Sequence, residues 1–109
     1  MSAVTTHVLD TVRGVPAVGV GVRLEELPGA RAIGRARTDS AGRINDLGPA
    51  ELPAGTYRLV FDTAEYFARH QHATYFPEVA VTFTIDGAER HHHVPLLLSP
   101  FAYATYRGS

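Results

Sequence analysis

The feature of this sequence that most constrains its fold is a series of short segments whose apolar residues recur at every second position. Between residues 18 and 24, each even-numbered position holds valine or leucine. This is the period of a strand with one buried face. Turn residues separate such segments at spacings of about 8–14 residues. We therefore predict a mainly β chain, an antiparallel two-sheet β-sandwich of roughly seven to eight strands with one short helix.

The expected elements follow from alternation and from β-branched or aromatic content. Segment 63–70 has good helix formers behind a candidate cap at Asp62 or Thr63, which predicts the helix. Asp86-Gly87 is a strong hairpin signal, so we expect residues 79–85 and 91–98 to pair with each other. The expected strands are 4–10, 18–24, 33–38, 56–62, 79–85, 91–98 and 101–106, with at most a short strand over 43–45.

The length and the net charge of the chain limit how many domains it can form and which partners it can bind. A chain of 109 residues is the size of one domain, so we expect residues 1–109 to form a single unit. Ten basic and eleven acidic residues give a net charge of −1, which argues against nucleic acid or an anionic membrane as partner. No stretch approaches the roughly 20 apolar residues of a membrane span, and we find no signal-peptide pattern. With no cysteine, we expect a cytoplasmic protein.

Six histidines are the main candidates for chemistry. Alternation places His7 on one face of strand 4–10 and His93 on one face of strand 91–98. The opposite face of 91–98 carries valine and leucines and is the better core face, so we expect both histidines on the outer face of one sheet. Such residues serve as solvated surface groups or as general acids and bases. His91 and His93 also have a metal-ligand spacing, but no suitably spaced carboxylate completes a site, and we predict no metal and no cofactor.

Two terminal motifs resemble the signatures of the transthyretin-related 5-hydroxyisourate hydrolases. Residues 6–17 match the N-terminal signature, and residues 93–109, ending in Tyr-Arg-Gly-Ser, match the C-terminal one. Between them, residues 38–44 match the turn that carries the family's arginine. The resemblance covers essentially the whole chain, and it implies a transthyretin-like sandwich.

The resemblance also implies an activity. The family opens the ring of 5-hydroxyisourate by water addition at a cyclic amide carbonyl, giving 2-oxo-4-hydroxy-4-carboxy-5-ureidoimidazoline in urate degradation. It implies a homotetramer, a dimer of dimers, with sites in a cleft where two dimers meet. The implied catalytic residues are His7, Arg43 and His93, and the implied substrate-binding residues are Tyr106, Arg107, Gly108 and Ser109. The alternative is a transthyretin-like carrier of a small aromatic ligand without turnover, which has lysine, glutamate and threonine at the three catalytic positions and lacks the Tyr-Arg-Gly-Ser ending.

Three residues near the second motif carry further expectations. Pro95 falls in an inner strand, where proline removes a ladder donor, so we expect a bulge or a missed hydrogen bond. His92, where the family often has tyrosine, should lie on the face opposite the site. Gly108 has no β-carbon and should let the backbone pass close to a neighbour or to the substrate.

Overall fold

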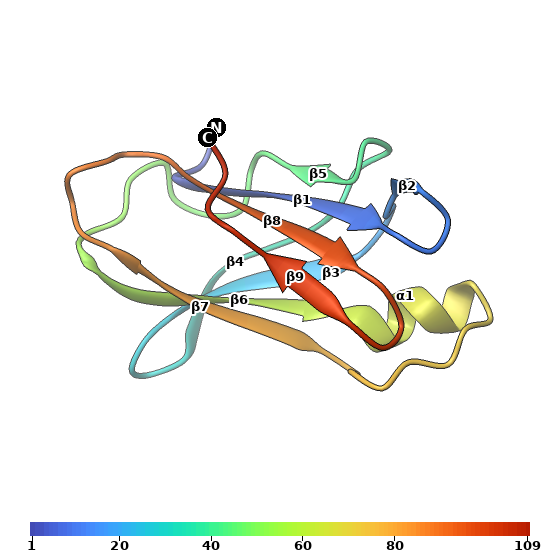
Figure 1. The fold of residues 1–109 in the computed structure, drawn as a ribbon. Coiled ribbons are helices and arrows are strands. Elements are labelled where there is room, and N and C mark those ends of the chain that lie inside the picture. Colours follow the sequence, from blue (N-terminus) through green and yellow to red (C-terminus); the bar gives the residue numbers. More distant parts are fainter.

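The computed structural model describes all 109 residues and shows two stacked β-sheets with one short helix at one end (Figure 1). The sandwich and the helix confirm the expectation from the sequence. Nine strands form, because residues 15–16, expected as part of a turn, and residues 43–44 each pair as a two-residue strand. The elements are β1 (Val4–Asp10), β2 (Val15–Pro16), β3 (Gly21–Glu26), β4 (Arg31–Arg37), β5 (Arg43–Ile44), β6 (Gly55–Asp62), α1 (Thr63–Arg69), β7 (Val79–Ile85), β8 (His92–Leu98) and β9 (Tyr103–Thr105).

The strand order sets which residues share a face. One sheet has the order β2-β1-β8-β9, with β5 pairing β1, and the other has the order β4-β3-β6-β7. All pairs are antiparallel except β1 with β8, which run parallel with Val4 opposite His92 and Asp10 opposite Leu98. Parallel neighbours need a long connection, and here most of the chain lies between the two strands. The sandwich is therefore antiparallel with one central parallel pair.

The hairpin expected at Asp86-Gly87 does not form. The turn itself exists, since Gly87 has a φ of +88° and the Asp86 carboxylate accepts a hydrogen bond from the Ala88 amide at 2.9 Å. However, β7 pairs with β6 in one sheet and β8 with β1 and β9 in the other. The connection over 86–91 is long enough to cross between the sheets instead of folding back within one.

Strand β3 begins later than the alternation at Val18 suggested. Gly19 has a φ of +78°, and the Thr38 hydroxyl accepts a hydrogen bond from the Val20 amide at 2.8 Å, so this stretch turns before it enters the sheet. At its other end, β3 runs through Glu26. Its buried Glu25 carboxylate is paired with Arg23 and with Arg58, each at 2.8 Å.

The core fills the space between the sheets. Alternation identified its contribution from β1 and β8 correctly, since Val4, Val8, Leu96 and Leu98 are buried. The helix closes one end of the core, where the Tyr66 hydroxyl donates a hydrogen bond to the Asp10 carboxylate at 2.7 Å. At 7 residues this helix is far too short to cross a membrane, and no other helix forms.

Candidate active site

The outer face of the five-stranded sheet brings together three residues that lie far apart in the sequence. Strand pairing sets Arg43 of β5 directly opposite His7 of β1. On the other side of β1, His93 of β8 is opposite Thr5, which shares the outer face with His7. His7 and His93 are half-buried in the single chain, and Arg43 is exposed. The three predicted catalytic side chains therefore share one surface.

A tight turn holds Arg43 beside His7. The Asp39 carboxylate accepts hydrogen bonds from the amides of Arg43 and Ala41, both at 2.9 Å. These bonds stabilise the ionised carboxylate and lower the pKa of Asp39. Gly42 has a φ of +74°, and a β-carbon there would lie 2.5 Å from the Val8 carbonyl oxygen, so only glycine fits. The side chain of Arg43 makes no ion pair within the chain, which leaves its guanidinium available to a ligand.

His93 is held from one side by a hydroxyl. Its Nδ1 lies 2.8 Å from the Thr5 hydroxyl oxygen, which is also 3.0 Å from Nε2 of His91. Burial lowers the pKa of His93, and electrostatic repulsion from Arg43, His91 and His7 lowers it further. A lowered pKa favours the neutral ring, the state in which an imidazole accepts a proton. Its Nε2 makes no hydrogen bond within the chain.

The C-terminal segment lies against the other side of His93. The ladder between β8 and β9 is interrupted at Pro95 and resumes as a single bridge between His93 and Gly108. This is the missed pairing expected at Pro95, whose carbonyl accepts a hydrogen bond from the Thr105 hydroxyl at 2.7 Å. The Gly108 amide donates to the His93 carbonyl at 2.8 Å. A β-carbon on Gly108 would lie 2.6 Å from the His93 ring, so the close approach expected of this glycine is present.

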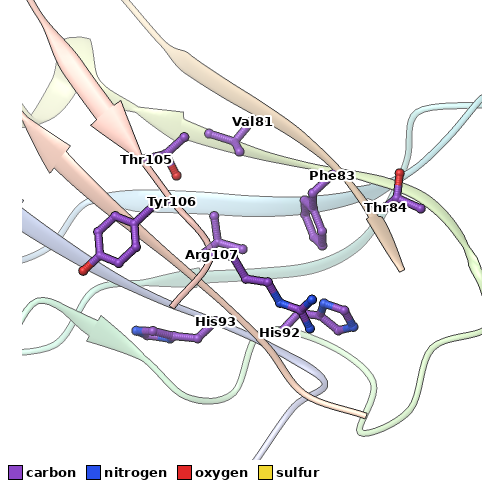
Figure 2. Close-up of a pocket in the computed structure, with 9 residues that line it drawn as sticks. Val81, Phe83, Thr84, His92, His93, Thr105, Tyr106 and Arg107 are labelled. Carbon is purple, nitrogen blue, oxygen red and sulfur yellow. The ribbon is translucent and has the colours of Figure 1, made fainter. Parts of the chain in front are cut away.

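The remaining residues of the tail are not all directed toward this face. In Figure 2 the rings of His93 and Tyr106 point to one side, whereas Arg107 and His92 point to the other. Arg107 forms an ion pair with Glu89, and Ser109 is exposed without a side-chain hydrogen bond. The single chain therefore gathers Gly108 and Tyr106 near His93, while the side chains of Arg107 and Ser109 make no hydrogen bond or ion pair with the histidines and arginine of the site.

A cavity of about 250 Å³ lies between the open edges of β7 and β9. Val81 and Phe83 of β7 line one side, and Thr105, Tyr106 and Arg107 line the other, together with His93. Of the three predicted catalytic residues, His93 alone borders this cavity, and His7 and Arg43 lie outside it.

Two observations concern the other histidines of this region. His92 lies on the core face, as expected, with 5% of its surface exposed and no hydrogen-bond partner for Nε2. The rings of His91 and His93 stack with centroids 6.4 Å apart, and no third His, Cys, Asp or Glu side chain joins them in a group that could hold a metal ion.

Thr5 is the residue of this site that sequence reasoning missed. The alternation of a strand puts it on the same face as His7, but its position opposite His93 depends on the parallel register of β1 and β8. No local signal encodes that register. A buried threonine hydroxyl between two imidazoles is visible only once the strands are paired.

Comparison with known proteins shows extensive similarity. The family model for the HIUase/Transthyretin family matches residues 4–108. A curated 5-hydroxyisourate hydrolase from Salmonella dublin is 44% identical over 108 residues, covering 96% of this chain and 79% of that protein. The solved structure of Klebsiella pneumoniae 5-hydroxyisourate hydrolase matches with a TM-score of 0.90 and 38% identity over 100% of both chains. Transthyretin from Sparus aurata matches with a TM-score of 0.92 and 30% identity, covering 99% of this chain and 97% of that one.

The backbone is thus equally similar to a hydrolase and to a transthyretin. Fold alone does not assign function. The choice between a hydrolase and a carrier therefore depends on the side chains that this chain carries, beginning with those on the outer face of the five-stranded sheet.

Proposed function

Because the chain belongs to the HIUase/transthyretin family, we propose that it is a hydrolase that opens the ring of 5-hydroxyisourate by adding water at a cyclic amide carbonyl. The product is 2-oxo-4-hydroxy-4-carboxy-5-ureidoimidazoline, in urate degradation. The observation that carries this proposal is the convergence of His7, Arg43 and His93 on one face. A ligand carrier has no need of two imidazoles beside a free guanidinium.

Each of these three groups suits one requirement of the reaction. Water attack needs a base, and a neutral imidazole accepts a proton at pH 7. We assign His7 and His93 to activating the water and to moving protons to and from the reacting atoms. Arg43 presents a planar fork of donors that suits a ring rich in carbonyl groups, or the oxyanion that develops at the attacked carbon. With no cysteine in the chain and no Ser–His pair evident from the spacing, direct attack by water is the economical choice over a covalent intermediate.

We also propose that the residues of the tail bind the substrate. Gly108 packs against His93, and Tyr106 lies on the same side of the strand, so both border the space in front of the imidazole. Arg107 and Ser109 complete this pocket in the assembled protein. For Arg107 this requires the ion pair with Glu89 to open, which costs little because both side chains are more than half exposed.

The assembly that we propose is a homotetramer, a dimer of dimers. Strands β7 and β9 end their sheets on the same side of the sandwich, with the cavity between them, so one copy can extend both sheets. The outer face around His7 also carries half-buried Leu9 and Leu97, and Tyr106 is 58% exposed. A second dimer over this face would turn the open site into a cleft. The predicted cytoplasmic location rests on the sequence alone and stays a prediction.

The decisive experiment is the ultraviolet decay of freshly generated 5-hydroxyisourate with and without the protein, before and after treatment with EDTA. We expect the protein to accelerate decay in both cases, because the assigned groups act without a metal. Arg43→Glu is the matched control and should leave a folded protein without turnover. Decay at the buffer rate, together with saturable binding of a small aromatic ligand, would instead establish the carrier. Loss of activity on chelation that zinc restores would make His91 and His93 metal ligands.

A further inference from the structure

A buried hydroxyl connects the half-buried His93 to an exposed histidine. The Thr5 oxygen lies 2.8 Å from Nδ1 of His93 and 3.0 Å from Nε2 of His91. Thr5 is 2% exposed and has no other side-chain partner, whereas His91 is exposed and comes just before β8 begins. The three polar atoms form a continuous path from the candidate site to solvent.

The single proton of the Thr5 hydroxyl couples the protonation of the His93 ring to that of the His91 ring. A threonine hydroxyl has one proton, so it donates to one imidazole while it accepts from the other. When Thr5 donates to Nδ1 of His93, the proton of the neutral His93 ring is on Nε2, and His91 donates to Thr5. When Thr5 donates to His91, the Nδ1–H of His93 donates to Thr5, and Nε2 of His93 is free to act as a base.

We infer that Thr5 and His91 are positioning residues that carry protons between His93 and solvent through the Thr5 hydroxyl. This inference rests on the proposed function, in which His93 takes a proton from the attacking water. The proton enters at Nε2 of His93 and gives an imidazolium. Its Nδ1 proton passes to the Thr5 oxygen as the Thr5 proton passes to Nε2 of His91. His91 then releases its Nδ1 proton to water, which leaves both rings neutral and Nε2 of His93 protonated.

The charges around His93 favour this outward transfer. Arg43 of β5, His7 of β1 and His91 all act electrostatically on the imidazole. Arg107, which is paired with Glu89, lines the same cavity as His93. A positive charge retained on half-buried His93 is repelled by Arg43, whereas the same charge on exposed His91 is solvated. The end state also has the proton on Nε2 of His93, where the departing ring nitrogen of the substrate needs one.

The coupling is testable without any substrate. In ¹⁵N-labelled full-length protein, the ring nitrogen shifts of His93 report which nitrogen carries the proton. We expect intermediate shifts, from exchange between the two arrangements, in the wild type and in Thr5→Ser. Thr5→Val has nearly the same shape without the hydroxyl and should shift His93 to a single tautomer. Unchanged His93 shifts in Thr5→Val would overturn the inference even if the protein hydrolyses 5-hydroxyisourate.

Kinetics test whether the path carries protons. Thr5→Val should lower kcat by about 10- to 100-fold, on the scale of lost acid–base function, with little change in KM, and Thr5→Ser should restore most of the rate. His91→Gln keeps a donor for Thr5 but cannot bind a proton, so kcat should fall and the solvent isotope effect should rise. His72→Gln, an exposed histidine away from this face, is the matched control.

The outcomes separate this inference from the proposed function. If His91→Gln turns over like His72→Gln, or if Thr5→Val raises only KM, the hydroxyl merely orients the ring and the relay is wrong. If the wild type itself has no hydrolase activity, the proposed function fails and the relay loses its role. The His93 shifts still decide whether the coupling of the two rings exists.

Discussion

Gly108 lies so close to the imidazole of His93 that a β-carbon in its place would be 2.6 Å from the ring's Cδ2 atom. On the other side of the ring, Thr5 holds Nδ1. His93 is therefore fixed between a hydroxyl from the first strand and a glycine from the tail. The tail thus contacts the ring of a residue that lies in an inner strand.

Replacing this glycine should disturb the site without unfolding the protein. In Gly108→Ala the methyl group must displace either the tail or the His93 ring, and we expect kcat/KM to fall by about 10-fold or more, because small displacements of an acid–base group are costly. The position lies outside the core, so the free energy of unfolding should change by less than about 1 kcal/mol. Substrate decay and thermal unfolding measure the two effects. Gly29→Ala is the control, since a β-carbon at Gly29 meets nothing within 4 Å. Equal activity in the two variants would show that the contact is not needed.

The two histidines should be separately essential. We expect His7→Ala and His93→Ala each to lower kcat/KM by about 100-fold or more, the scale of a lost acid or base. Both side chains lie on the outer face, so the fold should survive, as measured by circular dichroism. His72→Ala serves as the control for loss of an exposed imidazole. Near-normal turnover in either variant would remove that histidine from the mechanism.

Arg43 should be needed for its shape as well as for its charge. Arg43→Lys keeps the positive charge but loses the planar fork, so we expect it to remain strongly impaired in kcat/KM. Arg35→Lys, at an exposed position of β4 in the other sheet, should be as active as the wild type. A fully active Arg43→Lys enzyme would mean that the reaction needs only a diffuse positive charge.

Local patterns predicted the parts of this fold that depend on neighbours in the sequence. Alternation identified β1, β6, β7 and β8, and capping identified α1, because both signals depend on residues a few positions apart. The ends of β3 were predicted less well. Glu25 is buried only because Arg23 and Arg58 neutralise it, and Arg58 comes from another strand. The charge of Glu25 suggests that the strand ends before it, but in the structure Glu25 belongs to β3.

Pairing between distant strands was not predictable from such patterns. Asp86-Gly87 gives the turn it predicts, but whether the chain then folds back or crosses to the other sheet depends on which strand edges are free. The parallel register of β1 and β8 likewise depends on residues far apart in the sequence. This register places Thr5 against His93. The resemblance to a family supplied His7, Arg43 and His93 as a set, whereas the roles of Thr5 and His91 required the register.

The pKa of His93 should depend on Arg43. Burial first, and then the charges of Arg43, His91 and His7, hold this pKa below its ordinary value. We expect Arg43→Gln to raise it, and an NMR titration of the His93 ring measures the change, with Arg35→Gln as control. A wild-type pKa at or above the ordinary value of about 6.5, or no rise in Arg43→Gln, would contradict the assignment.

The same shift has a consequence for stability with a definite sign. Because the pKa of His93 is lower in the folded state, the unfolded chain binds more protons as the pH falls below the ordinary value. The contribution of His93 to the free energy of unfolding is therefore fully present above that pH and is lost as the pH falls toward the folded pKa. In His93→Gln the free energy of unfolding should therefore fall less as the pH is lowered than it does in the wild type. Urea unfolding at several pH values measures this difference.

Additions to the tail should disturb the site more than additions at the other end of the chain. Gly108 bridges His93, and the tail around it borders the proposed cleft, so a hexahistidine tag after Ser109 should push bulk into the site and strongly lower activity. The same tag before Met1 should be tolerated better, since the residues before β1 make no hydrogen bond to the predicted site residues. Deleting residues 106–109 should abolish turnover but keep the sandwich, because β9 ends at Thr105 and the core residues all precede it. Substrate decay and circular dichroism compare the three forms. Equal activity of the two tagged proteins would mean that the Tyr-Arg-Gly-Ser ending takes no part in catalysis.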